Sequence, residues 1–391
     1  MRSLVITGLG LVSPLGVGAE ASFESLLARR SGLSAAPTVE GDGTHGWAGR
    51  IPSFDPSPWL PAMRARRLDR GSRFAVSAAR QAIDGAGLSG SPELAQQLAV
   101  IVGTSSAGAG PVTVFLDALF RQSPEAAPPF EFPNTVMNAP ASHVSIELGL
   151  RGPNLTLSHG EAVIAQALLV GRLMLADGRA TRLLAGAVDE WNPYYQAGYE
   201  QLRALRSTPE GGGGTLLCEG AALMVLEEPE AAEARRAAVL ARLLGAGASS
   251  APGEAYRWIA NPKALERAIR QALDEAGLAP GDVGSVWLGA NGVEAMEEAE
   301  AAALETLFPG RHLAATGLKG AIGERAVSAA TTVAMAALAR SRNLLPPFAG
   351  GALVTWPDAV APCSTPTPLP AGATLVVLYG FGGNYGAVVL G

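Results

Sequence analysis

Lysine, histidine and cysteine are all scarce in this chain of 391 residues. Two cysteines cannot build a disulfide framework, which fits a reducing compartment. The four histidines are scattered and show no His-x-x-x-His spacing, so no metal or other cofactor is expected. Only two of the 29 basic residues are lysines, and the formal net charge is −6. No basic low-complexity tail is present, and this charge balance gives no reason to expect nucleic acid as a partner.

Apolar runs long enough to cross a bilayer are also missing. The most apolar helical pattern, Ala162–Ala176, carries Gln166 and Arg172 and is too short to span. The opening "MRSLVITGLGLVSPLG" is interrupted by two glycines and Pro14, so we interpret it as a first buried strand and not as a secretory signal. We therefore expect a cytoplasmic protein without a membrane partner.

An internal repeat is the most informative feature that is present. The segment "AARQAIDGAGL" (78–88) matches "AIRQALDEAGL" (268–278) at eight of eleven positions, with an offset of 190 residues. Each copy is followed by a short apolar strand pattern. The repeat predicts a duplicated unit, with one half at 1–235 and the other at 236–391, packed together intimately.

Strand-length apolar runs alternate with helical patterns along both halves, as in "LAVIVG", "RLLAGAV" and "TLVVLYGFGG". Continuous apolar strands between helices favour an α/β fold with mostly parallel sheets that are covered on both faces. We expect layers of helix, sheet, helix, sheet and helix. The pattern at Ala162–Ala176, apolar nearly all round, predicts a central helix between the two sheets.

One strand-to-helix turn stands out within "NLTLSHGEAVIAQALL" (154–169). A residue at such a turn is exposed at the end of a sheet, where enzymes often carry a nucleophile, and here that residue is Glu161. A second pattern, "GLGLVSPLG", suggests a dinucleotide-binding loop. Its third glycine position is Ser13, followed by Pro14, so we reject a nucleotide site there.

Five motifs in order along the chain resemble those of the beta-ketoacyl synthases of fatty acid and polyketide assembly. They are "VITGLGLVSPLG", "RRLDRGSRFAVSAA", "FPNTVMNAPASHVSIELGLRGPNLTL", "CEGAALMVLEEPEAAEARR" and "YGFGGNYGAVVL". The resemblance covers essentially the whole chain. It implies the thiolase-like fold, a five-layered αβαβα arrangement of two duplicated halves that forms dimers.

The resemblance also implies where catalytic residues should lie. Active members use a cysteine nine residues after the glycine of "GPN", two histidines and a supporting lysine. Counting from Gly152 reaches Glu161, and "LGANGVEA" (288–295) puts Asn291 at the first histidine. In "KGAIGERAVSAA" (319–330) the lysine is retained as Lys319, and Glu324 replaces the second histidine, or Ile322 in an alternative register. Without a thiolate and imidazoles, condensation is not expected.

Glu161 leaves two interpretations open. Its carboxylate would be stabilised by a helix N-terminus and could form an ion pair with Lys319. Alternatively, it fills a vestigial site and holds the helix that contacts the partner.

In lacking the catalytic residues, this chain resembles one subfamily, the chain length factors of bacterial type II polyketide synthases. Such a subunit forms a heterodimer with a catalytic ketosynthase and shapes the tunnel in which the polyketide grows on an acyl carrier protein. Aromatic-polyketide members commonly carry glutamine where this chain has Glu161, which favours the factors of reduced, polyene-forming systems. Two alternatives remain: a stand-alone enzyme using Glu161 as acid or base on acyl thioesters, and a homodimeric protein that binds acyl carrier protein.

The resemblance further places a tunnel-lining helix after "GTSS", where "AGPVTVFLDALF" (109–120) has an apolar stripe with helical spacing. The small Ala109 and Gly110 would leave room for a chain, whereas the competing interpretation is an ordinary core stripe. The loop 135–137 is expected to cross toward the partner, and Phe381 matches the family's glycine-flanked phenylalanine beside the active site. The predicted set for the chain-length pocket and interface is Ala109, Val112, Leu116, Thr135, Val136, Met137 and Phe381.

An arginine cluster lies where family members contact the acidic carrier protein. Docking by complementary charge would use Arg64, Arg66, Arg67 and Arg70. The alternative is a solvated basic helix in which Asp69 bridges to a neighbour.

Overall fold

Two copies of one strand order make up the main sheet. A computed structural model of the chain describes residues 3–37, 39, 44–91, 94–209, 213–350 and 354–391. In the first half the order is β6 (Asn154–Leu157), β5 (Leu98–Gly103), β7 (Arg182–Asp189), β9 (Gly220–Glu227) and β1 (Leu4–Ser13). In the second half it is β12 (Leu313–Thr316), β11 (Val283–Trp287), β16 (Ala373–Gly380), β17 (Asn384–Leu390) and β10 (Ala241–Ser250). Strand β1 pairs antiparallel with β10 and so joins the halves.

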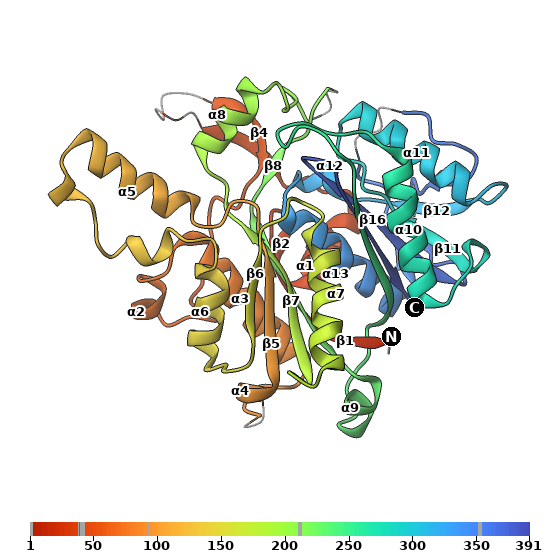
Figure 1. Ribbon diagram of the computed structural model, residues 1–391, viewed down its shortest axis with the longest axis horizontal. Helices are drawn as coiled ribbons and strands as arrows, with labels where there is room; N and C mark the ends of the chain where they lie inside the picture. Colours follow the sequence, from red (N-terminus) through yellow and green to blue (C-terminus); the bar gives the residue numbers. More distant parts are fainter. Residues whose placement is uncertain (1–2, 38, 40–43, 92–93, 210–212, 351–353) are drawn as a thin grey trace.

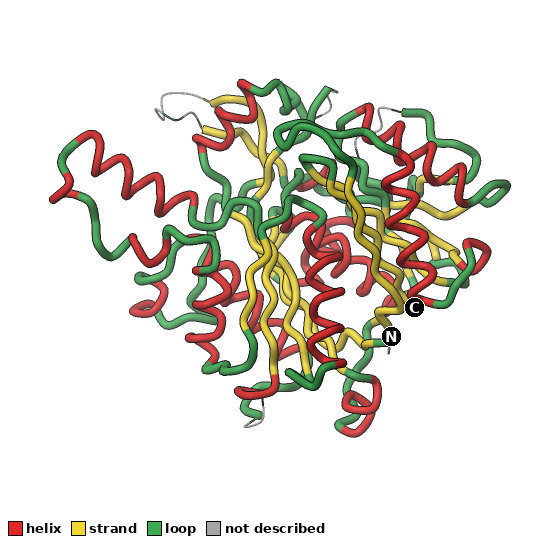
Figure 2. The backbone as a smooth tube through the Cα atoms, viewed as in Figure 1, coloured by secondary structure: helices red, strands yellow, loops and turns green. Residues whose placement is uncertain are grey.

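The helices form three layers around these strands. Helix α3 (Arg70–Gly85) packs on β1 and β9, and α10 (Pro262–Ala276) packs on β10 and β17. Between the halves lie α7 (Val163–Ala176) and α13 (Ala326–Arg342), each of which contacts strands of both halves. Figures 1 and 2 show this central pair with strands on either side and α3 and α10 outside. The five-layered fold and the central helix predicted from 162–176 are therefore confirmed.

The expectation of mostly parallel sheets is wrong. Strand β5 is parallel to β6 and β7, but β9 is antiparallel to both β7 and β1. The second half repeats this mixture, with β17 antiparallel to β16 and β10. Strands buried on both faces are apolar throughout whichever way they run, so their composition carries no signal of direction.

Glycines in the first strand of each half bring the outer helix close to the sheet. A Cβ atom at Gly10 would lie 1.8 Å from the carbonyl oxygen of Ala78 in α3, and one at Gly8 would lie 2.0 Å from that of Ala82. In the second half, Gly247 and Gly245 face Ala268 and Ala272 of α10 in the same way. The Gly-x-Gly pattern thus serves helix–sheet packing, which agrees with our rejection of a nucleotide site.

Helix α5 (Ala109–Arg121) extends away from the body of the molecule (Figure 1). The chain returns through two short 3₁₀ segments, η1 (Pro124–Ala126) and η2 (Phe132–Asn134), to α6 (Ala139–Leu148). Large apolar side chains are exposed along this arm: Phe120 at 79%, Phe130 at 89% and Phe132 at 61%. An apolar projection of this kind indicates a contact surface for another molecule.

Shorter elements complete the chain. The helices are α1 (Ala19–Leu27), α2 (Ala62–Ala65), α4 (Leu94–Gln97), α8 (Pro193–Gln201), α9 (Pro229–Ala234), η3 (Pro280–Asp282), α11 (Glu294–Leu307) and α12 (Lys319–Ile322). The strands are β2 (Gly16–Val17), β3 (Leu33–Pro37), β4 (Thr44–Gly49), β8 (Leu217–Cys218), β13 (Leu344–Leu345), β14 (Val360–Pro362) and β15 (Thr367–Pro368). None of the described helices has the length and apolarity needed to cross a bilayer.

Candidate functional site

Glu161 lies at the turn between β6 and α7, as the sequence predicts. The turn passes through Gly160 at φ +76°, a conformation that favours glycine. Glu161 is buried, at 3% exposure, and its Oε2 accepts a hydrogen bond from the backbone N–H of Phe381 at 2.8 Å. Glu161 directly precedes Ala162, the N-cap of α7, but no side-chain cap hydrogen bond forms there, and the expectation of a side chain exposed at the end of the sheet is wrong.

The predicted ion pair between Glu161 and Lys319 is wrong. The Nζ atom of Lys319 lies 2.6 Å from Oε2 of Glu324 instead, and both side chains are at most 1% exposed. Lys319 is in the short helix α12, and Glu324 follows the turn at Gly323, which has φ +90°. Glu324 is only five residues from Lys319, so the local turn brings the two charges together.

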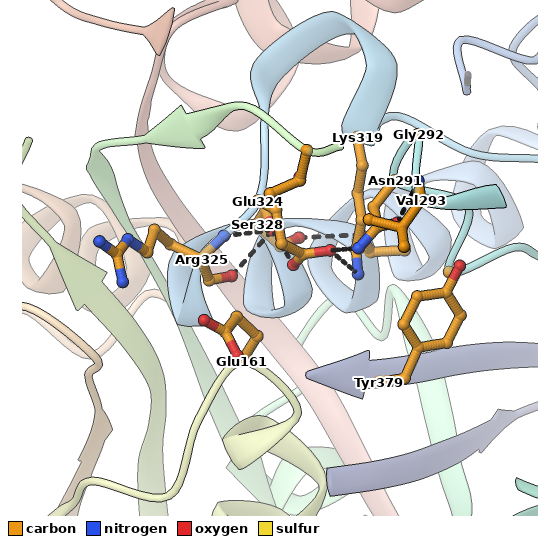
Figure 3. Close-up of polar contacts among 12 residues, drawn as sticks. Glu161, Asn291, Gly292, Val293, Lys319, Glu324, Arg325, Ser328 and Tyr379 are labelled. Carbon is orange, nitrogen blue, oxygen red and sulfur yellow. Dashed lines mark hydrogen bonds and ion pairs between the residues drawn. The ribbon is translucent and has the colours of Figure 1, made fainter. Parts of the chain in front are cut away.

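Asn291 meets the same carboxylate. Its Nδ2 donates to Oε2 of Glu324 at 3.1 Å, and its Oδ1 accepts from the N–H of Val293 at 3.1 Å. The hydroxyl of Ser328 donates to the other oxygen of Glu324 at 3.0 Å. Figure 3 shows Glu324 at the centre of these contacts. Of the two registers considered for the second histidine position, the one at Glu324 thus brings a side chain into contact with Asn291 and Lys319.

Burial sets the electrostatics of this cluster. Desolvation raises the pKa of Glu324 to about 7, and the nearby ammonium of Lys319 only partly offsets this effect. Nζ of Lys319 also lies 5.1 Å from the ring centre of Tyr379, whose hydroxyl donates to Glu300 at 3.2 Å. Desolvation raises the pKa of Glu300 to about 8. The polar side chains of this cluster therefore contact one another within the chain.

Arg325 is a site residue that sequence reasoning missed. It precedes α13, and its guanidinium points away from Glu324 (Figure 3). Nη1 donates to the hydroxyl of Tyr199 at 3.1 Å, and the guanidinium carbon lies 4.7 Å from the centre of that ring and 5.4 Å from that of Tyr195. An arginine directly before the apolar run "AVSAATTVAMAALA" was the available signal, because such a run predicts a buried helix start.

A cavity of about 350 Å³ opens beside Glu161. Phe381, Tyr199 and Arg325 line it together with Ser105 and His159. Phe381, which was predicted beside the former active site and grouped with the chain-length set, belongs to this cavity. Neither cysteine lines the cavity, and both are buried. Ser105 and His159 also line the cavity, but the Ser105 hydroxyl contacts Asp189 and not His159, so these two do not form an activated nucleophile.

A second cavity, of about 540 Å³, lies along α5. The predicted stripe of Ala109, Val112 and Leu116 lines it, together with Thr135 and Met137. Leu116 is 40% exposed, so the stripe is not an ordinary core stripe. Val136 is 47% exposed and Gly110 faces the buried Glu190 instead of the cavity. Of the two small residues expected to leave room, only Ala109 does so.

Of the four arginines predicted to bind a carrier protein, Arg64, Arg66 and Arg67 are exposed and Arg70 is half-buried. Arg66 and Arg67 are exposed and line a third cavity with Arg73. Arg64 pairs with Glu147 at 3.1 Å, whereas Arg70 turns to Glu219 at 2.7 Å. Asp69 does not bridge to a neighbouring arginine as that alternative expected; it is the N-cap residue of α3. Its side chain accepts from the N–H of Ser72 at the start of α3.

Comparison with known proteins identifies the family. The model of the beta-ketoacyl synthase N-terminal domain matches residues 1–232, and that of the C-terminal domain matches residues 240–351. A 3-oxoacyl-acyl-carrier-protein synthase 2 from Vibrio harveyi is 31% identical over 291 residues, which cover 69% of each chain. One from Coxiella burnetii is 30% identical over 367 residues, which cover 88% of this chain and 87% of the relative.

Solved structures give the same fold. The ishigamide ketosynthase/chain length factor matches with a TM-score of 0.89 and 26% identity, covering 100% of this chain and 99% of that one. A ketosynthase in complex with its chain length factor from Xenorhabdus doucetiae matches with a TM-score of 0.85 and 20% identity, covering 100% and 98%. With both domain models matched in order and relatives of about 30% identity, this chain belongs to the beta-ketoacyl synthase family.

Proposed function

We propose that this chain is a noncatalytic chain length factor, which pairs with a catalytic ketosynthase and shapes the tunnel of the growing polyketide. The proposal rests on the spacing of the family motifs, which predicts that Glu161, Asn291 and Glu324 stand at the positions of the family's catalytic groups. Condensation requires a thiolate to carry the acyl chain and imidazoles to stabilise the enolate, and none of these side chains can replace them. The retained Lys319 is bound to Glu324.

The arm around α5 supplies the surface for the partner. Its cavity of about 540 Å³ is mostly apolar, and Phe120 on its rim is 79% exposed. Burying such rings against a second subunit would be favourable, at about 25 cal/mol per Å² of apolar area. The side chains at positions 109 and 112 then set how far the growing polyketide can extend into the tunnel.

The third cavity is the proposed contact for acyl carrier protein. Arg66, Arg67 and Arg73 line it together with Phe130. Asp69 and Glu131 also line it, so three arginines face two carboxylates there, and the excess of positive charge beside an exposed aromatic ring suits an acidic partner protein. We place the complex in the cytoplasm, since both buried cysteines are free.

The alternative of a stand-alone enzyme at Glu161 has less support. An acid or base needs a second group for the reacting atoms, and the two candidates from the sequence, Lys319 and Glu324, are paired with each other. Glu161 itself accepts the Phe381 N–H.

Co-expression with a ketosynthase encoded beside this chain tests the proposal. We expect a one-to-one complex by light scattering, and we expect Phe120→Asp to weaken it because a charge would be buried in an apolar contact. Met63→Asp is the matched control, since Met63 is 68% exposed on α2 and outside the α5 cavity. A homodimer that ignores the ketosynthase would refute the heterodimer and favour the homodimeric carrier-binding protein.

A further inference from the structure

The cavity beside Glu161 contains a buried positive charge that has no carboxylate partner. Arg325 lines this cavity and is 4% exposed. Its side chain donates to the Tyr199 hydroxyl and stacks between Tyr195 and Tyr199, and it forms no ion pair with any described residue. Arg70, by contrast, is more exposed and yet pairs with Glu219 through two nitrogens.

The carboxylates nearest to Arg325 are engaged by the backbone. Oδ1 of Asp189 accepts from the N–H groups of Ser105 and Ser106, both at 2.8 Å, and its Oδ2 accepts from that of Val327 at 2.9 Å. Glu161 accepts from Phe381. Asp189 and Glu161 act on Arg325 through longer-range attraction, but neither forms an ion pair with it, so its guanidinium can still take a carboxylate that contacts it directly.

The walls of the cavity select the kind of anion. The Phe381 ring lies edge-on to Trp258 at 5.1 Å and against Tyr199 at 5.3 Å, which gives a rigid aromatic wall beside the guanidinium. One cation next to the carboxylate of Glu161 favours a singly charged ligand over a doubly charged one. The planar fork of arginine matches a carboxylate.

We propose that this cavity binds a small monocarboxylate, with its head group on Arg325 and its hydrocarbon part against Phe381 and Tyr199. Polar groups at the rim come from Ser105, Ser158, His159 and Asn384. The site lies on this chain alone, so the inference does not depend on the proposed pairing with a ketosynthase. In this chain a former catalytic site has become a binding site.

Butyrate is the probe, with butyramide and inorganic phosphate for comparison. Isothermal titration of the purified full-length protein, in its complex if it is isolated as one, should give saturable binding of butyrate. Butyramide lacks the charge and should not bind. Phosphate is largely doubly charged at pH 8 and should bind more weakly than butyrate. Equal binding of butyrate and butyramide, or tighter binding of phosphate, would overturn the proposal.

Substitutions locate the binding on this chain. Arg325→Met should abolish butyrate binding, and Arg325→Lys should weaken it at least about tenfold, because lysine lacks the two-pronged geometry.

Ala255→Trp provides a test that leaves the buried cluster intact. Ala255 is exposed at the rim of the cavity, so a tryptophan there should block entry. Ala260→Trp is the matched control, on an exposed residue of the same loop outside the cavity. Loss of binding in the first variant and not in the second supports the site. Unchanged binding in Ala255→Trp would refute it, even if the Arg325 variants fail to fold.

Discussion

The buried pair of Lys319 and Glu324 should be coupled strongly enough to measure. Lys319→Met leaves the Glu324 carboxylate buried, with Asn291 and Ser328 as its remaining donors. Glu324→Gln leaves the ammonium without its counter-ion. The double variant removes both charges, and the four proteins form a double-mutant cycle.

The geometry sets the expected magnitude. At 2.6 Å and an effective dielectric constant of about 20, the Coulomb attraction is roughly 6 kcal/mol, and desolvation of both ions cancels much of it. Removing one partner of such a pair costs about 3–5 kcal/mol. For a chain of 391 residues, this lowers the melting temperature by about 4–6 °C.

Urea titration and thermal unfolding would measure these changes. The double variant should recover most of the loss, because neither charge is then left buried alone. Lys263→Met is the control: this lysine also pairs with a glutamate, Glu266, at 2.9 Å, but its side chain is 73% exposed. We expect a change below about 1 kcal/mol there. If Lys319→Met and Lys263→Met cost the same, burial does not decide the strength of the pair and the reasoning fails.

Three further predictions concern the tunnel, the packing and the pH dependence. In the heterodimer, Ala109→Phe should shorten the polyketide product, whereas Val114→Phe, on α5 but outside the cavity, should not. Mass spectrometry of the products measures their lengths. Equal product lengths in the two variants would refute the placement of the tunnel along α5. Gly10→Ala should destabilise the fold by at least about 2 kcal/mol, because its Cβ atom would overlap α3, whereas Gly198→Ala in the open space of α8 should stabilise it by about 0.5–1 kcal/mol. Denaturant titration would measure both changes in the free energy of unfolding. No change in Gly10→Ala would mean that α3 can shift freely away from β1. Burial raises the pKa of Glu300 to about 8, so above about pH 4.5 the folded state holds a proton that the unfolded state has lost. The contribution of Glu300 to the free energy of unfolding therefore falls as pH rises from about 5 to 8, by up to roughly 1.4 kcal/mol per pH unit. Glu300→Gln should flatten that slope in melting experiments, and an unchanged slope would contradict the assignment.

The sequence was sufficient where the signal was local or repeated. The repeat at 78–88 and 268–278 predicted the duplicated halves, and the turn before α7 predicted where Glu161 would lie. Spacing from short motifs predicted that catalytic groups would be replaced at Asn291 and Glu324. The duplication and the turn could be predicted because strand and helix periods and tight turns depend on neighbouring residues, whereas the replacement at Asn291 and Glu324 stays a prediction.

Contacts between distant segments were not predictable in the same way. Sequence reasoning paired Glu161 with Lys319 and missed both Arg325 and the inward turn of Arg70. Each error concerns which of several charges meet, and that depends on side-chain directions fixed by packing between layers. The prediction of mostly parallel strands was wrong for a related reason, because strands buried on both faces are apolar whichever way they run.

By itself, then, the sequence determined the family and the duplicated architecture, and it predicts that the catalytic groups are replaced, because these inferences follow from residue identity and periodicity. Only the tertiary structure decided which partners those residues have. It joined Lys319 to Glu324, engaged Glu161 with the Phe381 backbone and placed Arg325 at a cavity where no carboxylate forms an ion pair with it. The physical reason is that burying a charge is costly, and whether that cost is offset depends on atoms that are far apart along the chain and meet only after folding.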